Sequence, residues 1–204
     1  MADPDGVALD ERKWALRREM RARRTTLTDA ERAAASRAVA WHVLRHLPCR
    51  ERPRISLFWP LAEEIDTRPL LHILYALGAE PLLPRMQGKG RPLVFHRWSP
   101  DLPLVQGPFG VMEPPPELPP VLPEIVLAPL LAFDRRGHRL GYGAGFYDRT
   151  FDAVEAAGGA PLRVGLCFAC QEVTEVPVDE TDVPLDLVVT EEGPVVLRPT
   201  SGLS

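Results

Sequence analysis

The stretch EIVLAPLLAFDRRGHRLGYGAGFYDRTFDAVEAAGG, residues 124–159, decides the fold class. Its first ten residues (124–133) are the strongest strand signal in the chain and predict one buried strand. DRRG (134–137) has turn chemistry, with Asp first and Gly fourth. A glycine-rich loop follows, and then a predicted helix that ends at Gly158 and Gly159. A strand, a loop and a helix in this order are typical of an α/β domain with a largely parallel sheet.

Strand and helix signals alternate on both sides of this stretch. The other predicted strands are RISLFWPL (54–61), EPLLP (80–84), PLVFHRW (92–98), LRVGLCFA (162–169) and LDLVVT (185–190). RPLLHILYALGA (68–79) predicts a helix that stops at Gly78. Residues 99–123 contain nine prolines, a density that no helix or central strand tolerates. They predict an ordered surface connection within one domain that spans residues 1–204.

Two helices are predicted ahead of the sheet. The first covers about residues 10–24, and residues 1–9 are expected to be flexible. The second begins at Thr28, which forms a T-x-x-E capping box with Glu31, and it runs to about Leu47. The chain is therefore predicted to be an α/β domain with an N-terminal helical pair.

The composition is that of a soluble globular protein. Hydrophobic residues make up 45% and charged residues 25% of the 204 positions, which excludes wholesale disorder. No run approaches the roughly 20 apolar residues that a membrane span needs, and the N-terminal MADPDG has no apolar signal region. The three cysteines, Cys49, Cys167 and Cys170, are an odd, sparse set that fits a reducing compartment. We expect a cytoplasmic protein without a membrane partner.

The net charge of −4 conceals an asymmetry. Residues 1–54 hold 13 Lys and Arg against 8 Asp and Glu. Four cations of the first helix fall within about 80° of one another around its axis; they are Lys13, Arg17, Arg21 and Arg24. This face is either solvated or an anion site for phosphate or nucleic acid.

The glycine-rich loop predicts an anion cradle. Gly141, Gly143 and Gly145 let the backbone approach a ligand, and the following helix directs free N–H groups toward it. Arg139 adds a forked cation. The spacing matches neither a P-loop nor G-x-G-x-x-G, since Phe146 stands where the third glycine belongs. Spacing alone fits a structural turn nearly as well; a site is favoured because five reactive side chains fall within eleven residues, namely Arg139, Tyr142, Tyr147, Asp148 and Arg149.

Carboxylates in three places are candidate ligands. Asp148, in the first helical turn, either favours the helix dipole or holds Mg²⁺ beside a polyphosphate. Asp182, in DETDVPLD (179–186), is its candidate partner, unless that loop is merely acidic. Glu64 follows a core strand, where open α/β sheets bind ligands, and could accept hydrogen bonds from a nitrogen-rich heterocycle. Trp59 could offer the same ligand an aromatic face, whereas Phe58 fits the core.

Taken together, these residues resemble the 5-formyltetrahydrofolate cyclo-ligase family over roughly residues 12–192. The glycine-rich stretch is highly specific, and the order of the remaining segments adds to it. The segments are KWALR (13–17), FWPLAEEIDT (58–67), GPFGVMEP (107–114), LAPLLAFDRRGHRLGYGAGFYDR (127–149) and VPVDETDVPLDLVVTE (176–191).

The resemblance implies a three-layer, Rossmann-like α/β fold and an ATP-dependent enzyme. Members of the family use Mg²⁺ and ATP to close 5-formyltetrahydrofolate into 5,10-methenyltetrahydrofolate, releasing ADP and phosphate through a phosphorylated formyl group. This chemistry needs no protein nucleophile, and the sequence shows no nucleophile motif. The implied partner is the small-molecule substrate; we expect a monomer that binds no nucleic acid.

The resemblance also implies roles for individual residues. Lys13 and Arg17 are implied phosphate ligands, and Asp148 and Asp182 are implied Mg²⁺ ligands. The implied ATP loop consists of Arg139, Leu140, Gly141, Tyr142, Gly143, Ala144, Gly145, Phe146 and Tyr147, of which Arg139 and Tyr147 act in catalysis. The implied folate contacts are Trp59, Glu64, Tyr142, Gly143, Ala144, Gly145 and Phe146.

Two positions depart from the pattern G-x-G-[GK]-G-Y-Y-D that is frequent in the family. Ala144 supplies no lysine, and Phe146 lacks the hydroxyl of a tyrosine. These departures leave open a paralogue that acts on another N-formyl or carboxylate compound. A non-enzymatic RNA- or nucleotide-binding module is a further alternative, but it leaves Asp148, Asp182 and Glu64 without a role.

Overall fold

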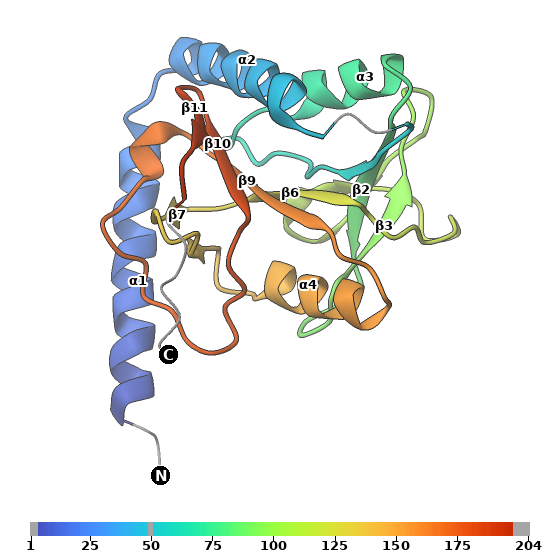
Figure 1. Ribbon diagram of the computed structural model, residues 1–204. Coiled ribbons are helices and arrows are strands. Elements are labelled where there is room, and N and C mark those ends of the chain that lie inside the picture. Colours follow the sequence, from blue (N-terminus) through green and yellow to red (C-terminus); the bar gives the residue numbers. More distant parts are fainter. Residues whose placement is uncertain (1–3, 49–50, 198–204) are drawn as a thin grey trace.

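The computed structural model describes residues 4–48 and 51–197, which form a central sheet with helices on both faces (Figure 1). In these ranges the sheet has seven strands in the order β11-β10-β9-β6-β1-β2-β3. Their bounds are β1 Arg54–Ser56, β2 Glu80–Met86, β3 Leu93–Arg97, β6 Ile125–Pro129, β9 Leu162–Leu166, β10 Leu187–Thr190 and β11 Gly193–Val195. The five inner strands are parallel, and the two edge strands pair antiparallel with their neighbours. The predicted largely parallel sheet is therefore confirmed.

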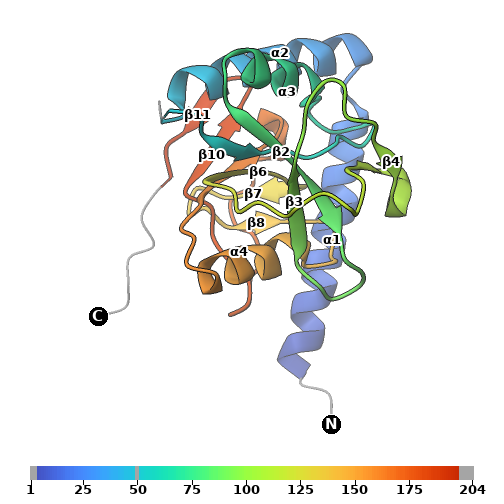
Figure 2. The same cartoon turned by 90° about the vertical axis from the view of Figure 1, so that its right-hand side faces the viewer.

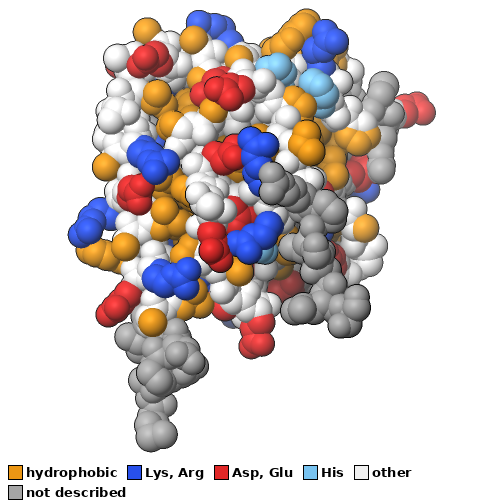
Figure 3. Space-filling model, turned by 60° about the vertical axis from the view of Figure 1, so that its left-hand side comes forward, with side chains coloured by type: hydrophobic (Ala, Val, Ile, Leu, Met, Phe, Trp, Pro, Cys, Tyr) orange, Lys and Arg blue, Asp and Glu red, His pale blue; other side chains and the backbone are white. Residues whose placement is uncertain are grey.

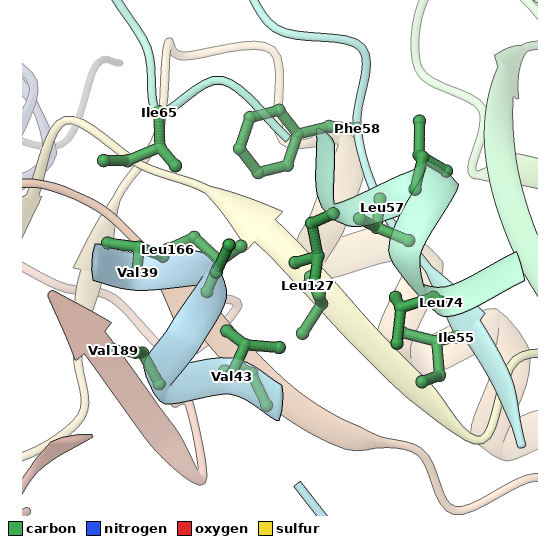
Figure 4. Packing of buried hydrophobic residues seen from close by; sticks show 14 of the residues in the cluster. Val39, Val43, Ile55, Leu57, Phe58, Ile65, Leu74, Leu127, Leu166 and Val189 are labelled. Carbon is green, nitrogen blue, oxygen red and sulfur yellow. The ribbon is translucent and has the colours of Figure 1, made fainter. Parts of the chain in front are cut away.

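Three helices complete the layers. Helices α2 (Asp29–His46) and α3 (Arg68–Ala76) cover one face, and α4 (Phe146–Ala156) covers the other (Figure 1). Beneath α2, Val39 and Val43 lie over the sheet residues Leu127, Leu166 and Val189 (Figure 4). Full burial of one such side chain contributes about 1.5–3 kcal/mol to stability. The predicted three-layer α/β architecture is confirmed.

Helix α1 (Pro4–Thr25) stands outside these layers. It runs along one side of the domain, and its N-terminal end projects beyond the remaining elements in both ribbon views (Figure 1, Figure 2). Met20 anchors it against Leu131, Ala132 and Leu140. Residues 4–9, which were expected to be flexible, form its first turns, and residues 1–3 lie outside the described part of the chain. None of the helices in residues 4–48 and 51–197 combines the length and apolar character that crossing a bilayer requires.

The strand predicted over residues 124–133 is divided in two. Strand β6 ends at Pro129, and β7 (Ala132–Phe133) pairs instead with β8 (Arg139–Leu140) in a separate hairpin. Between them, the Gln171 side-chain amide donates to the carbonyls of Leu130 and Leu131, at 2.7 and 3.0 Å. Because Gln171 satisfies these two carbonyls, the chain can leave the central sheet at this point. The single apolar run in the sequence therefore forms two separate strands. The DRRG turn is confirmed, since Gly137 N–H donates to the Asp134 carbonyl at 3.0 Å.

Other boundaries shift less. The strand predicted over residues 54–61 ends at Ser56, and the chain leaves the sheet before Pro60. Strand β11 was not predicted. The proline-rich connection contains no regular α-helix or central strand; it holds two short strands, β4 (Val105–Gln106) and β5 (Met112–Glu113), around a 3₁₀ turn (Pro108–Gly110). Thr28 caps α2 through the predicted capping box with Glu31.

The topology predicts where a ligand would bind. Strand β1 leads through α3 to β2 on one side, whereas the adjacent β6 leads through α4 to β9 on the other. The chain therefore changes direction between β1 and β6, and open α/β sheets bind ligands beyond the carboxyl ends of such strands. The segments that follow these two strands carry Glu64 and the glycine-rich loop.

Candidate active site

The glycine-rich loop ends at a helix start that carries no side-chain cap. Gly145 is the N-cap of α4, adopts φ +60°, and provides no side-chain hydrogen bond. Free N–H groups at a helix N-terminus attract anions. Gly143 adopts φ +100°, and a Cβ there would lie 3.2 Å from the Arg17 guanidinium carbon. Gly141 does not adopt a positive φ, and a Cβ there would meet open space. This position therefore does not require glycine.

The cationic face of α1 packs on this loop. Arg17 Nε donates to the Gly141 carbonyl at 2.9 Å, and Arg24 Nη1 donates to the Tyr142 hydroxyl at 2.9 Å. The Arg21 guanidinium carbon lies 5.7 Å from the centre of the Tyr142 ring. The predicted face is thus directed at the candidate site and is not wholly solvated.

Lys13 is buried between two carboxylates. Its side chain is only 9% exposed, and Nζ lies 2.6 Å from an oxygen of Asp179 and 2.6 Å from one of Asp182. A hydrogen bond from Lys13 is the main cause that lowers the pKa of Asp179 to about 2. Burial acts to lower the pKa of Lys13, but the two carboxylates outweigh it and raise that pKa. Lys13 therefore stays charged in a nearly buried position.

Arg139 forms a second buried ion pair. Nη2 donates to Asp148 Oδ1 at 2.7 Å, and Nη1 donates to the Val183 carbonyl. The Val183 N–H donates to the same Asp148 oxygen at 3.2 Å. Burial lowers the pKa of Arg139, and the charge of Asp148 opposes that effect. This arrangement joins the start of α4 to the loop at residues 179–186.

The two predicted magnesium ligands, Asp148 and Asp182, are connected through the loop at residues 179–186. Asp148 binds the N–H of the residue that follows Asp182, and each carboxylate is paired with a cation. In the described part of the chain, no group of three or more His, Cys, Asp or Glu side chains is arranged to hold a metal. Mg²⁺ is usually held by one or two carboxylates together with substrate phosphates and waters. The donor chemistry fits such a shared site, but not a cage made by protein alone.

Glu64 lies buried in the segment that follows β1, 8% exposed. Its Oε2 accepts the Leu61 N–H at 2.8 Å, and its Oε1 accepts the Tyr142 hydroxyl. Burial raises the pKa of Glu64, and the two hydrogen bonds partly offset it. The pKa of Tyr147 is raised by burial and then by the Glu64 charge. Glu64, from the segment after β1, therefore lies close to Tyr142 of the loop and Tyr147 of α4.

The remaining predicted residues are placed less directly. Leu140 is buried beside Met20, so only its backbone is available to a ligand. Phe146 is half-buried and packs on the core beneath α4, and exposed Ala144 accepts a hydrogen bond from Arg149 through its carbonyl. Trp59 is half-buried against the core cluster to which Phe58 belongs.

Sequence reasoning missed two groups of this site. Asp179 was not singled out, although it lies in the same acidic loop as Asp182. Arg24 was placed on the cationic helix face, but its contact with Tyr142 was not foreseen, since nothing local in the sequence encodes it.

Comparison with known proteins assigns this chain to a family. The sequence profile of the 5-formyltetrahydrofolate cyclo-ligase family matches residues 9–191. This chain belongs to that family. The 5-formyltetrahydrofolate cyclo-ligase of Haemophilus influenzae is 35% identical over 185 residues, which cover 88% of this chain and 98% of that protein. The protein of the same name from Escherichia coli K12 is 33% identical over 176 residues, covering 84% and 96%.

A solved structure supports the assignment to the cyclo-ligases. The 5,10-methenyltetrahydrofolate synthetase of Aquifex aeolicus, determined by NMR, superposes with a TM-score of 0.76 at 30% identity. The match covers 94% of this chain and 96% of that one. The predicted family resemblance is confirmed, and this cyclo-ligase is an enzyme of the ligase class.

Proposed function

We propose that this cyclo-ligase closes 5-formyltetrahydrofolate into 5,10-methenyltetrahydrofolate, with consumption of ATP in the presence of Mg²⁺ and release of ADP and phosphate. Family membership supports the reaction. The proposal for the nucleotide site is carried by the uncapped start of α4, with Arg17 and Arg139 beside it and Lys13 on the adjoining acidic loop.

The chemistry that we propose is phosphoryl transfer followed by ring closure. The formyl oxygen attacks the γ-phosphorus and ADP leaves; N10 of the folate then attacks the formyl carbon. Phosphate departs with the former formyl oxygen, and N10 loses its proton. Positioning and charge neutralisation dominate such reactions, so protein cations are more important than a protein nucleophile.

We propose that the ion pairs of the site exchange partners when the nucleotide binds. Lys13 and Arg139 now neutralise Asp182 and Asp148. Phosphate oxygens would take over the two cations, and the carboxylates would then be free to hold Mg²⁺. When bound, Mg²⁺ supplies further neutralisation of phosphate charge.

The folate is proposed to lie beyond the carboxyl ends of β1 and β6. Glu64 accepts hydrogen bonds from pterin N–H groups, and Trp59 and the loop residues 142–146 complete the contact. Arg139 and Tyr147 border the reacting groups. On the face that Figure 3 shows, Lys and Arg side chains are interspersed with Asp and Glu, which favours a small anion over a nucleic acid.

Turnover tests the proposal. Purified protein is mixed with 5-formyltetrahydrofolate, ATP and Mg²⁺, and the absorbing methenyl product is followed together with ADP. Product should require both ATP and Mg²⁺, and Arg139→Ala should abolish it. Arg135→Ala is the matched control, because Arg135 is an exposed arginine of the same hairpin that pairs with Glu172. Absence of product from protein that binds ATP would favour the paralogue acting on another N-formyl or carboxylate compound.

We also propose a cytoplasmic location. Cys167 and Cys170 are free thiols, as a reducing compartment implies; Cys49 lies outside the described residues. The expected monomeric state, and the absence of a nucleic-acid partner, stay predictions.

A further inference from the structure

One buried cation of the site has no part in the reaction proposed above. Arg24, near the end of α1, is 3% exposed, which is rare for an arginine. Its Nη1 donates to the Tyr142 hydroxyl at 2.9 Å, and its Nη2 lies 3.5 Å from Glu63 Oε2. Its Nε is buried without a hydrogen-bond partner among the described residues. Burying a guanidinium charge with one nitrogen unpaired lowers the stability of the folded protein, which indicates that Arg24 has a function.

The hydrogen bonds of Arg24 form a directed chain that ends at Glu64. Arg24 donates to the Tyr142 hydroxyl, and that hydroxyl donates to Glu64 Oε1. The three residues come from α1, from the loop before α4 and from the segment after β1. Arg24 makes no direct hydrogen bond to Glu64, so its influence passes through Tyr142 and through its charge.

We propose that Arg24 is a positioning residue for folate binding, which fixes the orientation of the Glu64 carboxylate through the Tyr142 hydroxyl and favours its ionised form through the nearby positive charge. The inference rests on the proposed function, in which Glu64 accepts hydrogen bonds from the pterin. A guanidinium suits this task, because it stays protonated when buried and its fork reaches two partners.

The surroundings of Glu64 explain why a cation is needed there. The ionised carboxylate only accepts hydrogen bonds, whereas protonation turns one of its oxygens into a donor. The titratable groups that interact with Glu64 are Arg24 from α1, Tyr142 from the loop and Tyr147 from α4. Arg24 is the positive one of these three, and Glu63, the neighbour of Glu64 in the chain, lies beside Arg24. Burial raises the pKa of Glu64, and the charge of Arg24 acts in the opposite direction.

The test compares Arg24→Leu with the wild type in steady-state kinetics over a range of pH. We expect the KM for 5-formyltetrahydrofolate to rise about tenfold at neutral pH, because loss of a neighbouring opposite charge favours the neutral carboxyl. The midpoint of the folate KM profile should move to higher pH, and the KM for ATP should not change. Arg24→Lys retains the charge and should restore most of the pH profile.

Arg23→Leu is the matched control. Arg23 is the neighbouring arginine of α1, exposed, and pairs with Glu19. Its removal should leave the folate KM and its pH midpoint at the wild-type values. A second variant, Tyr142→Phe, removes the linking hydroxyl and retains the ring. If Arg24 acts through that hydroxyl, adding Arg24→Leu to Tyr142→Phe should raise the folate KM much less than it does in the wild type.

Two outcomes overturn the inference while leaving the proposed function intact. One is a folate KM and pH midpoint in Arg24→Leu that match the wild type. The other is an equal rise of both KM values with a lower kcat and no shift of the pH profile, which would assign Arg24 a structural role. Failure of the wild type to turn over the folate would instead refute the proposed function.

Discussion

The substitution Asp148→Asn tests two roles of the Asp148 carboxylate, namely neutralising Arg139 and holding Mg²⁺. Asp148 accepts hydrogen bonds from Arg139 at 2.7 Å and from the Val183 N–H at 3.2 Å. The Arg139 side chain is 4% exposed, so water hardly solvates its charge. Asparagine retains an oxygen for both hydrogen bonds but removes the negative charge. The substitution therefore leaves a buried guanidinium without its ionic partner.

The structure sets the size of the effect. Removal of one partner from a buried ion pair costs about 3–5 kcal/mol. Asp148 itself is 23% exposed, and Arg139 retains the Val183 carbonyl, so the loss is smaller. We expect about 2 kcal/mol. For a chain of this length, that corresponds to a Tm lower by about 4–8 °C.

Thermal unfolding followed by circular dichroism measures both roles. ATP should stabilise the wild type, and Mg²⁺ should add to that stabilisation, because ligands that bind the native state raise Tm. In Asp148→Asn the added effect of Mg²⁺ should vanish. Asp152→Asn is the control, since Asp152 is an exposed carboxylate of the same helix. A variant with the wild-type Tm would refute the dependence of Arg139 on Asp148, and a retained Mg²⁺ effect would refute the metal assignment.

Three further measurements test other parts of the structure. Gly143→Ala forces a side chain to φ +100° at 3.2 Å from Arg17, so urea unfolding should show a loss of about 1–2 kcal/mol; a wild-type midpoint would mean that the loop adapts. The lowered pKa of Asp179, about 2 against 3.8, means that its pair with Lys13 stabilises above about pH 4 and is lost as the pH falls toward 2. After allowance for solvent screening this is about 1 kcal/mol, and urea midpoints of wild type and Asp179→Asn should converge at low pH; curves that stay parallel would contradict it. Thr28→Ala removes the cap of α2 and should cost about 1 kcal/mol, and an unchanged Tm would show that the cap is dispensable.

Features encoded by neighbouring residues were predictable. The capping box of α2 needs only Thr28 and Glu31, and both of its hydrogen bonds are present. The division between β6 and β7 could not be predicted in this way. Its carbonyls are satisfied by Gln171, which lies about 40 positions further along the chain. An apolar run contains no signal of so distant a partner.

The candidate site shows the same difference between features set by neighbouring residues and features set by distant partners. The 3.6-residue period placed Lys13, Arg17 and Arg24 on one face. In the structure Arg17 and Arg24 meet the glycine-rich loop, and Lys13 meets the acidic loop that holds Asp182. The period does not say which anions they meet. Asp148 and Asp182 were interpreted as metal ligands from their position, whereas the structure pairs both with cations. A metal ion bound by these carboxylates would have to compete with the two pairs, which no local sequence pattern indicates.

The position of α1 in the chain has a consequence for biosynthesis. Lys13 pairs with residues 166 and 169 positions further along, and Arg17 with one 124 positions further along. At ribosomal rates of 5–20 residues per second, α1 is exposed for about 10–30 s before Asp179 and Asp182 are made. During this time Lys13 lacks both of its ionic partners. A nascent chain released before Asp179 would also lack β10, so the proposed nucleotide site requires translation past that point.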